Sequence, residues 1–210
     1  MNSASDYEYK YKKLSVVNDQ IYFKRERFPV DNVTNLGFSW TGQKIITNFV
    51  PTGEDNQVAL TIYLSNRPKP ISIHYLGAHT RKIILEDTFS KAMKIHSIYK
   101  HLSQLTFEKR LHNYISEVEN KGYFTYTEAE FYRNGTLKLL KRNEVIELKY
   151  FSISRVPFAV YLKEKKPEPS TIMGLVKKKL SSPYDYSIPT QIDQDVFFSL
   201  LDHYYGYRWR

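Results

Sequence analysis

Through the first third of the chain, apolar residues alternate with polar ones, a period of two that predicts strands exposed on one face. Residues 14–16 and 21–23 flank Asn18-Asp19, a pair suited to a tight hairpin turn. We expect about seven strands in this region, as in a small barrel or sandwich. The other alternating segments are residues 36–40, 45–50, 58–64, 71–75 and 83–85, with breaks expected at Thr41-Gly42, Thr52-Gly53 and Arg67-Pro68-Lys69-Pro70.

The period changes to that of a helix after Thr88, a suitable N-cap. Apolar residues then recur at helical spacing from Met93 to Val118, and Gly122 follows as a stop. Because the run is about 30 residues long and its apolar stripe shifts near Thr106-Phe107, we expect a helix that packs on the first sheet and then bends or restarts.

The second half begins with the aromatic segment 123–126 and contains Asn134-Gly135, a strong hairpin signal. A Lys/Pro-rich stretch covers 163–169, and residues 191–205 have helical spacing that ends at Gly206. Further strands are expected at 129–131, 137–139, 145–151 and 158–162.

The two halves match in order. Asn18-Asp19-Gln20-Ile21 corresponds to Asn134-Gly135-Thr136-Leu137, and 60–64 corresponds to 158–162. A Pro-x-Pro segment and then a helix follow in each half, which predicts a duplicated fold, the alternative being chance likeness between β segments. The expected domains are 1–106, a helical connector 107–122, and a shorter unit 123–210.

Seven short strands followed by one amphipathic helix resemble the bacterial pleckstrin-homology-like (PH-like) domains. In residues 10–105, Ile95, Ile98, Tyr99 and Leu102 would form the helix face that closes the barrel. The resemblance implies an α+β, mainly β fold with two PH-like units, each ending in a helix. It also implies a module that binds phosphoinositide head groups, peptides or proteins, without catalysis.

In lipid-binding members of that family, basic residues of the first hairpin hold the phosphates. The nearest match is Lys24-Arg25-Glu26-Arg27, which we expect on the second strand, several positions beyond the Asn18-Asp19 turn. The displaced position and the acidic Glu26 depart from the family pattern.

Composition limits the class of protein. The 210 residues include 18 Tyr and 12 Phe, as in a globular chain, and no Cys, which excludes disulfides, thiolate zinc sites and cysteine nucleophiles. Neither a signal-peptide core nor a membrane span is recognisable. We expect a cytoplasmic location, with a peripheral position at the membrane as the alternative.

The formal charge of +9 favours anionic partners. Short basic clusters are spread along the chain, for example Lys10/Lys12/Lys13 and Lys163/Lys165/Lys166, and each has the alternative role of a solvated face that aids solubility. The candidate anion-binding residues are Lys24, Arg25, Arg27, Lys141, Arg142, Lys177, Lys178 and Lys179.

No motif for catalysis, metal binding or cofactor binding is recognisable. His96 and His101 are five residues apart, whereas two ligands on one helix face need a spacing of three or four. The glycines occur singly, unlike a phosphate-binding loop. Glu147, Lys149 and Asp185 include the residue types of a nuclease site in the wrong order.

The leading hypothesis is therefore a non-enzymatic adaptor that binds a protein partner. The alternative is a basic module for anionic lipid, through 174–180, or for nucleic acid, through the aromatic and basic residues of 22–25 and 204–210. The competing interpretation of 174–180 is a mobile loop, and that of the aromatic residues is core packing. An enzyme with a dispersed active site ranks third.

Overall fold

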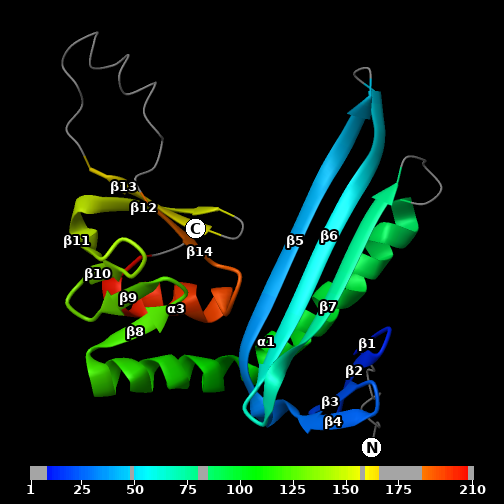
Figure 1. Ribbon diagram of the computed structural model, residues 1–210, viewed down its shortest axis with the longest axis horizontal. Coiled ribbons are helices and arrows are strands. Elements are labelled where there is room, and N and C mark those ends of the chain that lie inside the picture. Colours follow the sequence, from blue (N-terminus) through cyan, green and yellow to red (C-terminus); the bar gives the residue numbers. More distant parts are fainter. Residues whose placement is uncertain (1–8, 48–49, 80–84, 157–158, 166–185, 208–210) are drawn as a thin grey trace, which may run out of the picture. The chain divides into compact units, whose positions relative to one another are not determined.

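The chain folds as two compact units, Met1–Arg110 and Leu111–Arg210. The computed structural model describes residues 9–47, 50–79, 85–156, 159–165 and 186–207, and Figure 1 shows their strands and helices. The described strands form four open antiparallel sheets and no closed barrel. The expectation of a mainly β, α+β chain is confirmed at this level.

The first unit begins with a four-stranded sheet of consecutive hairpins. The Asn18-Asp19 turn is confirmed, with φ of 44° and 58°, the left-handed values that suit a two-residue hairpin. The outer two strands were missed, and the start of the fourth strand was assigned to the strand that follows the Asn18-Asp19 turn. The strands are β1 (Tyr9–Tyr11), β2 (Leu14–Val17), β3 (Gln20–Phe23) and β4 (Glu26–Pro29).

The 3-10 helix η1 (Val30–Asn32) leads into a sheet of three long strands, β5 (Val33–Thr47), β6 (Val50–Leu64) and β7 (Arg67–His79). The expected breaks at Thr41-Gly42 and Thr52-Gly53 are wrong, since both pairs lie inside continuous strands. Pro68 and Pro70 lie within β7, not in a turn. Proline is tolerated at such positions because, among the described strands, β7 pairs only with β6 and is therefore an edge strand.

Helix α1 (Leu85–Lys121) is continuous, so of the two alternatives expected near Thr106-Phe107 the restart is wrong, and the bend stays a prediction. Leu85 begins this helix and does not belong to a strand. The apolar stripe shifts because the helix serves two cores: Ile95 and Leu102 belong to the first core, whereas Tyr114 packs edge-on against Phe124 of the second unit.

The second unit repeats this order of elements. The predicted strand 145–151 is confirmed at 145–147 but is then interrupted by a 3-10 helix, and the strand Tyr186–Pro189 was missed. The Asn134-Gly135 turn is confirmed: Gly135 has φ of 85°, and the Thr136 N–H donates to Asn134 Oδ1 at 3.0 Å. The elements are β8 (Tyr123–Tyr126), β9 (Ala129–Tyr132), β10 (Thr136–Leu139), β11 (Glu144–Glu147), η3 (Leu148–Tyr150), β12 (Phe151–Val156), β13 (Ala159–Glu164), β14 (Tyr186–Pro189) and α3 (Gln194–Tyr205), which ends at Gly206 as expected.

Each unit has its own core. Leu14, Ile21, Leu60 and Ile98 are fully buried in the first, where α1 covers aliphatic strand residues. The second core is aromatic: Phe131 stacks on Phe124 with centroids 5.0 Å apart, and Tyr126 stacks on Phe197 at 3.8 Å. The alternating positions that the sequence marks as apolar are therefore the ones that pack.

Two backbone hydrogen bonds of the first unit have counterparts in the second unit. The Lys24 N–H donates to the Lys13 carbonyl and the Leu140 N–H to the Glu128 carbonyl, both at 2.9 Å. The bond from Val30 to Asp19 is likewise matched by the bond from Leu148 to Gly135, both 2.9 Å. Lys13 is thus equivalent to Glu128, and Asp19 to Gly135.

This alignment corrects the proposed match of 60–64 with 158–162. The first residue after each 3-10 helix pairs with the end of the middle strand: Val33 with Leu64, and Phe151 with Glu164. Leu64 is therefore equivalent to Glu164, two residues from the predicted position. Because strand patterns have a period of two, a slip of two residues leaves them unchanged.

Candidate functional site

Two turns of the first four-stranded sheet meet at one end and carry four cations. Lys12-Lys13 joins β1 to β2, and Lys24-Arg25 joins β3 to β4. The 2.9 Å bond from the Lys24 N–H to the Lys13 carbonyl holds the turns side by side. We call Lys12, Lys13, Lys24 and Arg25 the basic end. All four are exposed, and none forms an ion pair with the part of the chain that the structure describes.

The structure corrects the expected place of Lys24 and Arg25. They form a turn of their own, not part of the strand after Asn18-Asp19. Lys24 has φ of 58° and Lys12 has φ of 53°, a left-handed conformation that is uncommon for lysine. Since turns are usually recognised by Gly, Asn or Asp, these two hairpins contain none of the residues that mark a turn.

Arg27 lies on β4, on the solvent face of the sheet. Its guanidinium carbon is 5.6 Å from the centroid of the Tyr22 ring, and its Nε donates to Gln20 Oε1 at 3.1 Å. Of the four residues Lys24, Arg25, Glu26 and Arg27, the first two thus belong to the basic end, and Arg27 lies beside an exposed aromatic ring.

The equivalent end of the second unit is partly neutralised. Its turns are Thr127-Glu128 and the loop between β10 and β11, which contains the predicted residues Lys141 and Arg142. Lys141 Nζ lies 2.5 Å from Glu128 Oε1, and the Arg142 guanidinium lies 5.2 Å from the centroid of the Tyr186 ring. The anion-binding charge here is therefore smaller than at the basic end.

A cavity of about 210 Å³ opens at this end of the second unit. It is smaller than usual ligand pockets of about 300–1,000 Å³, and Glu128 places a negative charge on its wall. A small anion would meet Lys141 and Arg142 there, in competition with that carboxylate. The lining residues are Glu128, Leu139, Lys141, Arg142, Tyr186, Ser187 and Ile188.

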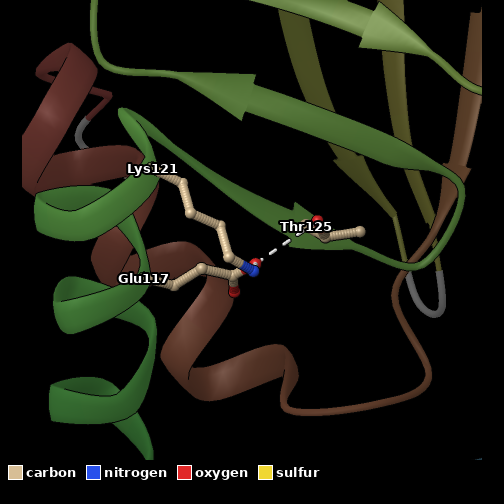
Figure 2. A network of polar contacts seen from close by, with 3 residues as sticks. All are labelled: Glu117, Lys121 and Thr125. Atoms are coloured by element: carbon tan, nitrogen blue, oxygen red, sulfur yellow. Dashed lines mark hydrogen bonds and ion pairs between the residues drawn. The ribbon is translucent and has the colours of Figure 1, made fainter.

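On the solvent face of the second four-stranded sheet, basic side chains are also paired with acidic ones. Figure 2 shows Glu117 accepting from Lys121 at 3.1 Å and from Thr125 of β8 at 3.4 Å. Across the same face, Lys138 of β10 forms an ion pair with Glu130 of β9 at 3.4 Å. Acidic partners thus offset the basic side chains on this face.

Sequence reasoning placed Lys12 and Lys13 among the solvated clusters and missed their meeting with Lys24 and Arg25. The alternation of apolar and polar residues was a usable signal. It could have predicted how the strands at 14–16 and 21–23 pair, and therefore that the turns at their ends lie side by side. Lys177, Lys178 and Lys179, with the segment 174–180, lie outside the described residues.

The C-terminal tyrosines pack within the second unit. The Tyr205 hydroxyl donates to the Tyr132 carbonyl at 2.9 Å, and that of Tyr207 to the Leu148 carbonyl at 3.3 Å. Burial raises the pKa of both phenols. These two residues therefore serve packing, while 208–210 lie outside the described residues.

The helix histidines join aromatic packing. His101 stacks on Tyr9 with centroids 4.2 Å apart, and His96 lies 5.4 Å from Phe38 and 5.7 Å from Trp40. Burial lowers the pKa of both imidazoles. Within the described residues, no three His, Asp or Glu side chains gather as a metal site would require, and no helix is long and apolar enough to cross a membrane.

Comparison of the chain with models of protein families, with curated proteins and with solved structures gives no match.

Proposed function

We propose that this chain is a non-enzymatic binding protein whose first unit binds an anionic partner through the basic end. The observation that carries the proposal is the bond between Lys24 and Lys13, which brings four cations together in two adjoining turns. The four like charges repel one another, and the neighbouring carboxylate of Glu26 is ion-paired with Arg67 at 3.6 Å. A bound anion would relieve that repulsion, and their field would speed its approach.

We further propose that both units follow the PH-like plan and arose by duplication. The support is the shared order of four short strands, a 3-10 helix, three strands and a helix, together with the matching turn bonds. Under this proposal the basic end faces the partner and the second unit has a different role.

The test uses inorganic polyphosphate as a probe that carries charge without any other recognition feature. The double variant Lys13→Glu/Lys24→Glu should bind it at least about tenfold more weakly than the wild type, and wild-type binding should fall steeply with salt. The matched control is Lys94→Glu/Lys163→Glu, with the same change in net charge at exposed positions in the two units. Equal weakening in both double variants would mean that net charge alone matters, and would refute the proposal.

A protein partner remains the second candidate. Phe89 and Met93 lie one turn apart on α1 and are 51% and 37% exposed. An apolar pair at this spacing is the kind of surface that a protein interface buries. Partner binding that survives high salt and is lost in Phe89→Ser would favour this candidate over the anionic one.

A further inference from the structure

We propose that the anionic partner is a single-stranded nucleic acid, one base of which stacks on Tyr22 while its phosphates contact the basic end. This inference rests on the proposed function and names its ligand. The two parts of the site are an exposed aromatic ring on a sheet face and cations at the adjoining turns.

Tyr22 belongs to a row of outward-facing residues that crosses the whole first sheet. Val16 and Ile21 are fully buried, so their neighbours Ser15 and Tyr22 point to solvent. Tyr22 is 38% exposed, a large fraction for an aromatic residue on a strand. The strand registers pair Lys10 with Ser15, Ser15 with Tyr22, and Tyr22 with Arg27.

The neighbours of Tyr22 in this row leave part of its ring available. Arg27 lies over the ring on the β4 side, anchored by Gln20. On the β2 side the cross-strand neighbour is Ser15, whose short side chain cannot cover an aromatic face. A nucleobase can therefore enter over Ser15 and stack on Tyr22, with the guanidinium of Arg27 available to a phosphate or to the edge of the base.

The cations lie at the right place for the phosphates that flank this base. Lys13 lies in the turn directly before β2, and Lys24 lies in the turn directly after β3. They are two residues from Ser15 and Tyr22, roughly 7 Å along each strand. An extended strand of nucleic acid can thus pass from the turns onto the sheet face.

The arrangement favours a single strand over a bilayer or a duplex. The tips of both turns carry Lys12, Lys13, Lys24 and Arg25, with no apolar side chain that could enter a membrane. The aromatic ring lies back from the tips, where a flexible strand reaches it more easily than a flat lipid surface. In a duplex the bases are already stacked on one another and unavailable to Tyr22.

The second sheet offers an internal contrast. Its residue equivalent to Tyr22 is Lys138, which is ion-paired with Glu130, and its residue equivalent to Lys13 is Glu128. Stacking and phosphate binding are therefore both absent from the equivalent described positions. We infer that nucleic-acid binding belongs to the first sheet alone.

The decisive experiment compares two labelled oligomers by fluorescence anisotropy. One is oligothymidylate, and the other has the same length and charge but carries abasic tetrahydrofuran units in place of nucleosides. The wild type should bind oligothymidylate about tenfold more tightly than the abasic oligomer, because only the former can stack. Tyr22→Ala should bind both oligomers equally, and Tyr22→Phe should keep the preference. The matched control Tyr150→Ala, at a 55% exposed tyrosine of the second unit, should also keep it.

Equal wild-type affinity for the two oligomers would overturn the inference, and so would a preference that Tyr22→Ala retains. The wild-type comparison needs no variant, so misfolding of Tyr22→Ala leaves the test intact.

Polyphosphate separates the two proposals. If it binds through Lys13 and Lys24 while thymine adds nothing, the proposed function stands and the nucleic acid is wrong. Binding of phosphatidylserine vesicles without binding of either oligomer would likewise assign the basic end to a membrane.

Discussion

The first and second four-stranded sheets share their backbone plan and differ on their solvent side. Both have three hairpins, the same bond between the first and third turns, and buried residues at alternating positions. At the turns, however, Lys13 stands where the second unit has Glu128. On the open face, Tyr22 stands where the second unit has Lys138.

The difference shows which positions can change without loss of the fold, and therefore where the binding properties of a unit can change. Inward positions must fill a core and therefore stay apolar in both units. Outward positions and turn residues contact mainly solvent, so they can change from aromatic and basic to ion-paired without loss of the fold. The binding properties of each unit should thus depend on the outward set.

The largest expected effects concern the buried core positions that the two sheets share. Ile21 and Leu137 are equivalent and fully buried. Replacing either with alanine should lower the free energy of unfolding of its own unit by about 2–5 kcal/mol, because each change leaves a cavity. Hydrogen exchange followed by mass spectrometry would localise the loss to one unit. Ser15→Ala, at an outward position, is the control and should change stability by less than about 0.5 kcal/mol. A much smaller loss for Leu137→Ala than for Ile21→Ala would mean that the cores are not built alike.

Exchanging the charges of the equivalent turn residues Lys13 and Glu128 tests the difference in charge between the two sheets. Lys13→Glu should make the negative slope of log affinity for polyphosphate against log salt less steep by about one, since one phosphate contact is lost. Glu128→Lys should raise binding by the second unit, because it removes the partner of Lys141 and adds a cation. Titrations at several salt concentrations would measure both slopes. Unchanged slopes in both variants would contradict a role for these turns.

A smaller effect comes from the middle hairpin of each sheet. Asp19 and Gly135 are equivalent and both left-handed, with φ of 58° and 85°. Asp19→Gly should remove the strain of a side chain in this region and stabilise the first unit by up to about 1 kcal/mol. Gly135→Ala should destabilise the second unit by about 1 kcal/mol. Chemical unfolding would give both values, and changes of the opposite sign would refute the proposed equivalence.

The smallest expected effect is a dependence of stability on pH, and it concerns only the first unit. Burial holds the pKa of His96 and of His101 below the ordinary 6.5, with Lys100 lowering that of His96 further and Asp19 raising that of His101. Both imidazoles are more easily protonated in the unfolded chain. The stability they contribute is therefore complete above about pH 6.5 and is lost as the pH falls toward their folded pKa.

Thermal unfolding at about pH 7.5 and 5.5 would check this expectation. The first unit should melt at a lower temperature at the lower pH, and His96→Gln should reduce the difference. The second unit provides the comparison, because its His112 and His203 are exposed. A first unit that becomes more stable on acidification would show that protonated histidine is favoured in the aromatic packing.

The amino-acid sequence by itself determined the local structure where periodicity and turn chemistry agree. The alternation around Asn18-Asp19 and Asn134-Gly135 specified both hairpins, and the helical spacing before Gly206 specified α3. The repeated order of elements was visible for the same reason, since each segment carries its own pattern of burial. The local signals failed where they were ambiguous: glycines inside β5 and β6 resembled breaks, and the pattern 145–151 hid the 3-10 helix η3.

Only the tertiary structure decided which charged residues act together. Lys13 and Lys24 are 11 positions apart in the sequence, and their turns have none of the residues that mark a hairpin. Their juxtaposition depends on the register of three successive hairpins, and the neutralisation of Lys141 depends on the same register in the second sheet. Register results from the packing of a whole sheet against its core, so no single segment of sequence contains it.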